Sequence, residues 1–305
     1  MQKLSILVTG GCGFIGSHLV SALLEHGHRV TVLDNLSNGE RESIPIEASL
    51  REGDVCIEED VVAAMHSIDF CFHLAAIASV SQSVDEWKAT HDINLGGTIN
   101  IFEAAKQRGI PVVYASSAAV YGASRQLPLT EGGVTNPLTA YGIDKLACEL
   151  HAQFAYRAFK FRTIGLRFFN VYGPRQAENS SYSGVISTYI RQIKSRQPLI
   201  VYGDGCQTRD FIYIDDVVSA LLRCLTLNPK ASLISNVCTG MPQSINQLIT
   251  MLSEITGMVP QVSYQSARIG DIYNSYGDPT FYQRQFYVNK STDLQTGLIR
   301  LLRYG

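Results

Sequence analysis

Three residues of this chain have the types and the spacing needed to move a proton to and from a hydroxyl group. Tyr141 precedes Lys145 by four positions, and Ser117 lies twenty-four residues before the tyrosine. Free tyrosine is a poor base at neutral pH because its pKa is about 10, but a nearby ammonium favours the phenolate. Residues four apart share one face of a helix, so Lys145 can lie beside Tyr141. A Tyr-x-x-x-Lys match alone is also typical of an exposed helix, and a strand-end serine often bonds its own backbone.

A glycine-rich turn near the start of the chain predicts a dinucleotide site. Gly10, Gly13 and Gly16 directly follow an apolar strand at 4–8 and open a helix at 14–26. In such a turn the glycines allow a tight bend and let the backbone approach the pyrophosphate, which lies at the helix N-terminus. A glycine-rich turn without any ligand is the alternative interpretation.

Acidic residues after the second and third predicted strands indicate which dinucleotide binds. Asp34 follows a strand at 29–33 and comes eighteen residues after Gly16. A carboxylate there accepts hydrogen bonds from both ribose hydroxyls of NAD and repels the 2′-phosphate of NADP. Asp54 is a candidate for binding the adenine amino group. We therefore expect NAD as the cofactor, although an aspartate that only caps a turn would give the same pattern.

Short apolar strands and helices alternate through the first half of the chain, which is typical of a doubly wound parallel sheet with helices on both faces. After residue 170 the chain becomes rich in Gly, Pro, Asn and Ser. We predict an α/β fold with a Rossmann-type NAD-binding domain at 1–170, to which 208–240 returns. A smaller C-terminal substrate-binding domain then comprises 171–207 and 241–305.

Composition and charge exclude several classes of protein. The 305 residues are 46% hydrophobic and 17% charged, with a net charge of −2, which argues against a nucleic-acid-binding surface. The longest apolar runs fall well short of the roughly 18 residues that a membrane span needs, and the N-terminus is too glycine-rich for a signal peptide. Seven cysteines occur singly, so we interpret them as reduced core thiols and expect no bound metal. A cytoplasmic location is the resulting expectation.

Taken together, these motifs resemble the extended short-chain dehydrogenase/reductase family of nucleotide-sugar enzymes, up to about Asp278. The cofactor segments are Thr-Gly-Gly-Cys-Gly-Phe-Ile-Gly at 9–16, Asp-Asn-Leu-Ser-Asn-Gly at 34–39 and His-Leu-Ala-Ala at 73–76. The catalytic segments are Ala-Ser-Ser-Ala-Ala-Val-Tyr-Gly at 115–122 and Tyr-Gly-Ile-Asp-Lys at 141–145. Segments similar to those that bind the sugar nucleotide lie at 167–175, 208–216 and 268–272.

The resemblance implies a role for each matching residue. Ser117, Tyr141 and Lys145 would be catalytic, and the last two would also contact the cofactor. The other residues implied to contact NAD are Gly10, Gly13, Phe14, Ile15, Gly16, Asp34, Asn35, Asn38, Gly39, Asp54, Val55, Leu74, Ala75, Ala76, Asn94 and Phe168. Those implied to contact the sugar nucleotide, besides Ser117, are Ala78, Ser79, Asn170, Val185, Tyr202, Arg209, Arg268, Asp271 and Ser275. In this set Asn170, Arg209 and Arg268 would hold the pyrophosphate, Asp271 the uridine ribose and Tyr202 the base.

The residues that follow Ser117 indicate the reaction. Family members that eliminate water or carbon dioxide place acidic residues two or three positions before the tyrosine of Val-Tyr-Gly, where this chain has Ala118 and Ala119. Without a carboxylate, those reactions lose their acid and base. The resemblance then implies an NAD-dependent UDP-sugar 4-epimerase. Tyr141 would take the C4 hydroxyl proton while hydride moves to NAD, and hydride would return to the other face of a 4-keto sugar.

The substrate and the assembly are expectations from the same resemblance. Ser275 lies seven positions after Arg268, where epimerases restricted to plain hexoses carry a tyrosine. A small residue there resembles the enzymes that accept N-acetylated sugars, which favours UDP-N-acetylglucosamine and its galacto epimer, UDP-N-acetylgalactosamine. A homodimer through helices near 94–108 and 141–159 is expected by analogy. From Pro279 onward the chain departs from the family pattern.

Other functions remain open at this point. UDP-glucose or UDP-glucuronate is an alternative substrate for a 4-epimerase, and another nucleotide-sugar oxidoreductase would have the same scaffold. A non-catalytic dinucleotide-sensing protein is the alternative from a different class. Such a protein would have no need for the set of Ser117, Tyr141 and Lys145, all of which are present.

Overall fold

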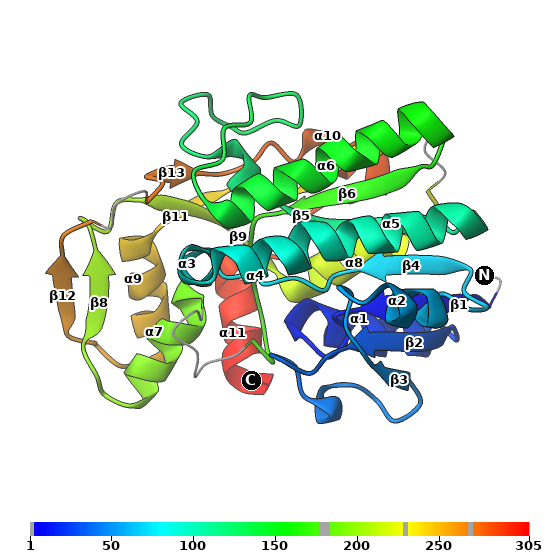
Figure 1. Ribbon diagram of the computed structural model, residues 1–305. Coiled ribbons are helices and arrows are strands. Elements are labelled where there is room, and N and C mark those ends of the chain that lie inside the picture. Colours follow the sequence, from blue (N-terminus) through cyan, green and yellow to red (C-terminus); the bar gives the residue numbers. More distant parts are fainter. Residues whose placement is uncertain (1–2, 177–183, 228–230, 268–270, 305) are drawn as a thin grey trace.

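A parallel sheet of seven strands forms the centre of the larger part of the molecule (Figure 1). The computed structural model describes residues 3–176, 184–227, 231–267 and 271–304. The strand order is β10-β6-β5-β4-β1-β2-β3, and every neighbouring pair is parallel. The predicted α/β fold with a doubly wound sheet is thereby confirmed. The strands are β1 (Ser5–Thr9), β2 (Arg29–Asp34), β3 (Ser49–Glu52), β4 (Phe70–His73), β5 (Val112–Ser117), β6 (Thr163–Phe168) and β10 (Leu233–Val237).

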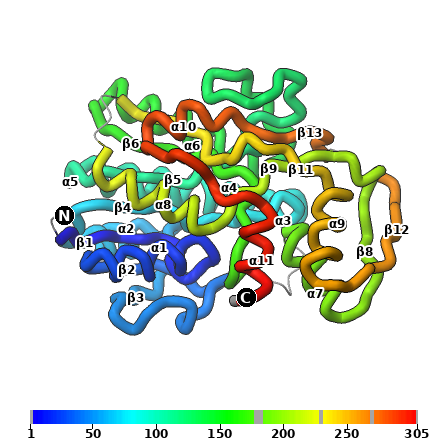
Figure 2. Tube along the Cα trace, turned by 180° about the vertical axis from the view of Figure 1, so that it is seen from behind, coloured from blue at the N-terminus to red at the C-terminus, as the bar shows by residue number. Residues whose placement is uncertain are grey.

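Helices cover both faces of this sheet, as the two opposite views show (Figures 1 and 2). Successive residues of a strand point to opposite faces, so Ile6 and Val8 join one core whereas Leu7 joins the other. Strands buried on both sides read as continuous apolar runs, which is the pattern seen in the sequence. One face carries α2 (Glu58–Ala64), α5 (Gly97–Arg108) and α6 (Ala140–Phe159), and the opposite face carries α1 (Phe14–Glu25), α8 (Ile214–Cys224) and α10 (Thr280–Phe286).

Short helical segments connect β4 and β5 to the helices that follow them. The path into α5 has a π-helical segment, η2, without any break in the helical backbone. A 3-10 helix, η3, directly follows β5. No helix in the described segments is both long and apolar enough to cross a membrane. The segments after β4 and β5 are α3 (Val80–Asp85), α4 (Trp87–His91), η2 (Asp92–Gly96) and η3 (Ala118–Tyr121), whereas η1 (Arg41–Ser43) lies between β2 and β3.

A smaller part lies beyond the carboxyl ends of the parallel strands and has its own apolar core (Figure 1). A four-stranded sheet connects this part to the larger one, and β8 and β12 form a parallel pair at its far side. Its elements are β7 (Asn170–Tyr172), α7 (Val185–Lys194), β8 (Leu199–Tyr202), β9 (Thr208–Tyr213), β11 (Pro242–Ser244), α9 (Ile245–Thr256), β12 (Val262–Gln265), β13 (Asn274–Ser275) and α11 (Leu294–Tyr304).

One segment differs from the expectation that 208–240 returns to the larger sheet. Helix α8 and strand β10 do return to it, but β9 pairs with β7, β11 and β13 in the four-stranded sheet. The apolar run in β9 fits a buried strand in either sheet, because periodicity does not identify a strand's partners. Beyond Pro279, where the family pattern was lost, α10 packs on the large sheet and α11 on the smaller core.

Candidate active site

The glycine-rich turn at 10–16 is so tightly packed that a side chain at Gly10 or Gly16 would collide with the backbone. Gly10 has φ of +67°, and a Cβ there would lie 2.6 Å from the backbone nitrogen of Ala75. A Cβ on Gly16 would lie 2.1 Å from the carbonyl oxygen of Gly10. Helix α1 follows with Gly13 as its N-cap, and no described side chain caps that end. The first backbone N–H groups of α1 are therefore left for an anion, so the residues present fit the pyrophosphate of NAD.

The predicted ribose ligand stands beside this turn. The Oδ2 atom of Asp34 accepts a hydrogen bond from the backbone N–H of Cys12 at 2.9 Å, and its Oδ1 accepts one from Leu36 at 2.9 Å. The side-chain amide of Asn35 donates to Asp54 at 3.0 Å. Asp34, Asn35 and Asp54 thus gather at the carboxyl ends of β2 and β3, where the adenosine half of a dinucleotide lies in such folds. Asp34 also caps its own turn, and its contact with the ribose stays a prediction.

A buried chain of hydrogen bonds ties the glycine turn to the loop after β4. Thr9 and His73 end the neighbouring strands β1 and β4, and their Oγ1 and Nδ1 atoms lie 2.7 Å apart. On the other side of the ring, Nε2 lies 3.0 Å from Oγ1 of Thr98, whose hydroxyl donates to the carbonyl of Asn94 at 2.6 Å. Thr98 must therefore accept from Nε2–H. Burial favours the neutral imidazole, and in that form Nδ1 accepts from the Thr9 hydroxyl.

Asn94 acts on the cofactor loop from inside the protein. It is fully buried in η2, and its side-chain amide both accepts from the backbone N–H of Ile77 at 2.8 Å and donates to the carbonyl of Ile77 at 3.1 Å. The backbone N–H of Ala75 in the same loop donates to Thr9 Oγ1 at 3.3 Å. Residues 74–77 are thus held against the glycine turn by side chains from β1, β4 and η2. The implied contact of Asn94 with the cofactor stays a prediction.

The three residues predicted for proton transfer lie on two elements at the same edge of the sheet. Ser117 ends β5, and its Oγ accepts from the backbone N–H of Ala119 at 3.1 Å. Tyr141 and Lys145 lie in the first turns of α6, where Lys145 is 3% exposed and its Nζ is 5.8 Å from the centre of the Tyr141 ring. A Cβ on Gly142 would be 2.8 Å from the carbonyl oxygen of Ala119, so glycine lets α6 begin directly against η3.

Hydroxyl groups hold the first turn of α6, and one of them was missed by sequence reasoning. Thr139 caps the helix by accepting from the backbone N–H of Gly142 at 3.1 Å. The fully buried Ser83 of α3 accepts from the backbone N–H of Tyr141 at 3.2 Å and donates to the carbonyl of Val80 at 2.7 Å. Thr139 carries a local capping signal, but Ser83 is 58 residues from Tyr141 and has none.

The predicted sugar-nucleotide residues gather around β9. Asn170 on β7 pairs with Phe211, and Ser275 on β13 pairs with Arg209. Ser275 is buried, and burial lowers the pKa of Arg209, an effect that the nearby Asp271 opposes. Adjacent strands therefore bring an amide, a guanidinium and a hydroxyl together beyond the parallel sheet. Arg268 lies outside the described residues.

The remaining predicted residues surround these groups at varied depths. Phe168 pairs in register with Ser117 across β5 and β6 and is buried, as is Val55. Ala78 is exposed, and Ser79 caps α3 by accepting from Gln82 at 3.1 Å. Others lie at element ends: Phe14 and Ile15 begin α1, Val185 begins α7 and Tyr202 ends β8. In the loops, Asn38 is exposed, Gly39 lies against Cys12, and Leu74 and Ala76 flank Ala75.

Comparison with known proteins identifies the family. A family model described as the NAD dependent epimerase/dehydratase family matches residues 6–238. A putative UDP-glucose 4-epimerase of Methanocaldococcus jannaschii is 38% identical over 276 residues, which are 90% of this chain and 89% of that protein. The chain belongs to the NAD-dependent epimerase/dehydratase family. The predicted family and the predicted NAD cofactor are confirmed, as is an NAD-dependent enzyme of the nucleotide-sugar 4-epimerase type.

Solved structures of family members have the same fold over the whole chain. The UDP-N-acetylglucosamine 4-epimerase of Methanobrevibacter ruminantium, in complex with UDP-N-acetylmuramic acid, matches with a TM-score of 0.94 at 33% identity, covering 100% of this chain and 98% of that one. The UDP-glucose 4-epimerase of Thermotoga maritima, with UDP-glucose, matches with a TM-score of 0.95 at 33% identity, covering 99% and 98%.

The neutral His73 makes stability depend on pH. Burial, reinforced by the positive charge of Lys145, lowers the pKa of His73 to about 3. The unfolded chain binds this proton with a pKa of about 6.5, so between the two values only the unfolded state is protonated and the free energy of unfolding falls as pH falls. We expect His73 to contribute a loss of about 2 kcal/mol between pH 7 and pH 5.

Urea unfolding of the wild type and of His73→Asn at pH 5 to 7 measures this contribution. The variant should be less stable at pH 7 but should lose less stability on acidification. His66→Asn, at an exposed position, is the control and should keep the wild-type slope. Equal slopes for wild type and His73→Asn would contradict a neutral, buried His73.

Proposed function

We propose that the protein interconverts the C4 epimers of a UDP-hexose, with UDP-N-acetylglucosamine and UDP-N-acetylgalactosamine as the preferred pair. The observation that carries the proposal is the convergence of Ser117, Tyr141 and Lys145 on one edge of the sheet, followed by Ala118 and Ala119 in η3. A hydroxyl, a phenol and an ammonium can provide the proton transfer of a reversible oxidation at one carbon, for which NAD would be the hydride acceptor. With alanines at the two positions after Ser117, no carboxylate stands there for an elimination or a decarboxylation.

NAD, when bound, supplies a hydride acceptor that becomes the donor for the return step. The protein's part is to move a proton and to hold the sugar. Tyr141 lies at the N-terminal end of α6, with Nζ of Lys145 5.8 Å from the centre of its ring, and is the proposed base. The phenolate takes the proton of the C4 hydroxyl, and Ser117 donates a hydrogen bond to the same oxygen. The proton returns from Tyr141 after the 4-keto sugar has presented its opposite face.

The groups around β9 suit the nucleotide half of the substrate. Arg209 has a guanidinium that can bind diphosphate oxygens through two N–H groups, and Asn170 projects from the neighbouring strand β7. Arg268 is proposed to assist, Asp271 to bind the uridine ribose and Tyr202 to line the base. Held at its diphosphate, the sugar is free to turn over between the two hydride transfers.

The choice of sugar rests on Ser275. This residue is buried in β13 directly beside Arg209 in β9, which supports a position close to the sugar-nucleotide site. A serine leaves volume that an acetamido group can occupy. UDP-glucose is the second candidate, because a small side chain does not exclude a smaller substrate. One similar solved structure is named a UDP-N-acetylglucosamine 4-epimerase and another a UDP-glucose 4-epimerase, so similarity supports a UDP-sugar without choosing one.

We also propose a homodimer through α5 and α6. Ile143, Leu150 and Phe154 of α6 are 54%, 57% and 57% exposed and follow an i, i+7, i+11 pattern, which places them in one stripe. Ile99 of α5 adds a further exposed apolar side chain. A two-fold axis beside α6 would pack this stripe against its own copy and remove it from water. That arrangement leaves the carboxyl edge of the sheet open to substrate.

A panel of UDP-sugars, with the product read by NMR at C4, tests the proposed activity. The wild type should bring UDP-N-acetylglucosamine and its galacto epimer to equilibrium. Tyr141→Phe should lower kcat by at least about 10²-fold, because general acid–base catalysis is lost while binding changes little. Tyr264→Phe, at an exposed position on β12, is the control. Wild-type turnover in Tyr141→Phe would remove this residue from the mechanism.

The role of Ser275 is tested by adding bulk. Ser275→Tyr should suppress turnover of UDP-N-acetylglucosamine and largely spare UDP-glucose, because steric exclusion acts only on the substrate with the acetamido group. The discrimination should exceed the roughly 1–3 kcal/mol that a single methylene provides. The measurement is kcat/KM for both sugars, with Ser263→Tyr on the exposed part of β12 as the control. Equal losses for both sugars would show that Ser275 is not the selector.

Light scattering after size-exclusion chromatography tests the dimer. Phe154→Glu places a carboxylate in the apolar stripe and near its own copy across the two-fold axis, so we expect a monomer at micromolar concentration. Ile46→Glu changes an apolar residue that is 96% exposed on the β3 side of the sheet and should leave the mass unchanged. A wild-type monomer, or a dimeric Phe154→Glu, would refute this interface.

A further inference from the structure

A buried ion pair lies under the catalytic edge of the sheet and takes no part in the chemistry described above. Glu149 of α6 and Arg167 of β6 have side chains that are 2% and 5% exposed. Nε of Arg167 donates to Oε1 of Glu149 at 2.8 Å, and Nη2 donates to Oε2 at 2.7 Å. The contact is thus a two-point fork, which fixes the angle as well as the distance between a helix and a strand.

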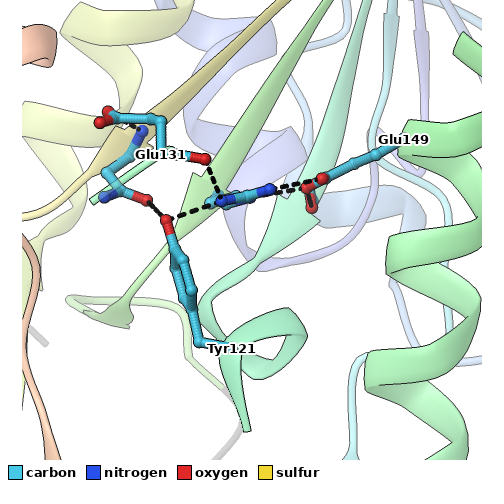
Figure 3. Close-up of polar contacts among 6 residues, drawn as sticks. Tyr121, Glu131 and Glu149 are labelled. Carbon is cyan, nitrogen blue, oxygen red and sulfur yellow. Dashed lines mark hydrogen bonds and ion pairs between the residues drawn. The ribbon is translucent and has the colours of Figure 1, made fainter. Parts of the chain in front are cut away.

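Further groups from neighbouring elements complete this cluster (Figure 3). Ser116 of β5 donates to Oε1 of Glu149 at 2.5 Å. Nη1 of Arg167 donates to the hydroxyl of Tyr121 at 2.8 Å and to the carbonyl of Glu131 at 3.3 Å. The guanidinium also lies 4.7 Å from the centre of the Tyr121 ring. Every nitrogen of the guanidinium therefore has an acceptor, and both carboxylate oxygens have donors.

The cluster extends to the edge strand of the sheet. The hydroxyl of Tyr121 donates to Oδ1 of Asn236 on β10 at 2.6 Å, and the backbone N–H of Asn236 donates to Oε1 of Glu131 at 2.8 Å. The amide of Asn236 donates in turn to the carbonyl of Leu129 at 2.9 Å. One polar unit, which we call the Glu149 cluster (Ser116, Tyr121, Glu131, Glu149, Arg167 and Asn236), thus joins α6, η3 and three adjacent strands.

The placement of this cluster relates it to the site. Glu149 is one helical turn beyond Lys145 and two turns beyond Tyr141 on α6, while Ser116 directly precedes Ser117 on β5. The hydrogen bond between Ser116 and Glu149 therefore links the two elements that carry the three catalytic residues. Apolar packing between α6 and the sheet resists separation, but it is non-directional and does little to prevent a helix from sliding or rotating. A two-point fork resists both movements.

We propose that the Glu149 cluster is a positioning device that sets the register of α6 against β5, so that Tyr141 and Lys145 meet the substrate oxygen held by Ser117. This inference rests on the proposed function. Buried ion pairs are often no more stabilising than well-packed apolar residues of similar volume, so a gain in stability does not by itself explain the ion pair between Glu149 and Arg167. Geometry is the stronger reason, since a displacement of about 1 Å at reacting groups costs about 10²-fold in rate.

The double variant Glu149→Leu/Arg167→Met separates positioning from stability. It removes both charges together, so neither is left buried without its partner, and it keeps apolar volume in their place. We expect a folded protein with NAD and UDP-sugar affinities within about twofold of the wild type and with kcat lowered by roughly 10- to 100-fold. Asp215→Leu/Arg300→Met is the matched control, because it replaces an exposed carboxylate–guanidinium pair between α8 and α11. Its kcat should equal that of the wild type.

Amide hydrogen exchange over 139–145 gives a readout that does not depend on activity. In the double variant, exchange in this first part of α6 should be at least several-fold faster while the core strands stay protected.

If the wild type epimerises no UDP-sugar, the proposed function fails, and the exchange measurement still decides whether the cluster holds α6. If the double variant does not fold, Ser116→Ala and Tyr121→Phe replace it, and each should lower kcat severalfold. Unchanged kcat and unchanged exchange would overturn the proposal.

Discussion

The hydrogen bond between Thr9 and His73 joins β1 to β4 at the point where the strand order of the parallel sheet reverses. From β1 the chain builds outward to β2 and β3 on one side and to β4, β5 and β6 on the other, so the connecting loops diverge and leave a crevice. Both loops that border this crevice depend on the same bond. Thr9 leads into the glycine turn, and its hydroxyl also accepts from Ala75 in the facing loop. Burial keeps the imidazole neutral, and in that form Nδ1 is the acceptor of this bond. The buried His73 therefore helps to hold the glycine turn against the loop that contains Ala75.

The residues proposed to be catalytic lie at the same edge of the sheet, but they are held in a different way. Ser117 is placed by the sheet, whereas Tyr141 and Lys145 are placed by one end of a twenty-residue helix. Thr139 and Ser83 satisfy backbone N–H groups at the start of that helix, and the Glu149 cluster anchors it two turns later. The positive ends of two helices thus meet at the edge of the sheet. We propose that the end of α1 serves the pyrophosphate of NAD and that the end of α6 carries the base.

The parts of the site that depend on local spacing were predictable from the sequence. The glycines at 10, 13 and 16 lie in one turn and the pair Tyr141 and Lys145 on one helix face, so each is marked by spacing over a few residues. Asp34 is marked by its place at the end of the next predicted strand. The alternation of strands and helices likewise predicted the parallel sheet.

The groups that support the site were not predictable in this way. Ser83 meets Tyr141 across 58 residues, and Asn236 meets Tyr121 across 115. No local pattern marks either pair, since only the finished fold makes them neighbours. The same reason explains β9, whose apolar run indicated a buried strand but not the sheet that it joins. For Asn94 the sequence resemblance implied a cofactor contact, which stays a prediction, but its bond to the backbone of Ile77 had no local signal.

The central claim is that C4 of the sugar is oxidised and reduced again on the protein, with Tyr141 moving only the hydroxyl proton. UDP-N-acetylglucosamine carrying deuterium at C4, incubated with the enzyme in ordinary water, tests it most directly. The account predicts that the galacto epimer retains deuterium at C4, because the hydride never exchanges with solvent. Product with hydrogen at C4 would contradict the account, since the carbon-bound hydrogen would then leave as a proton.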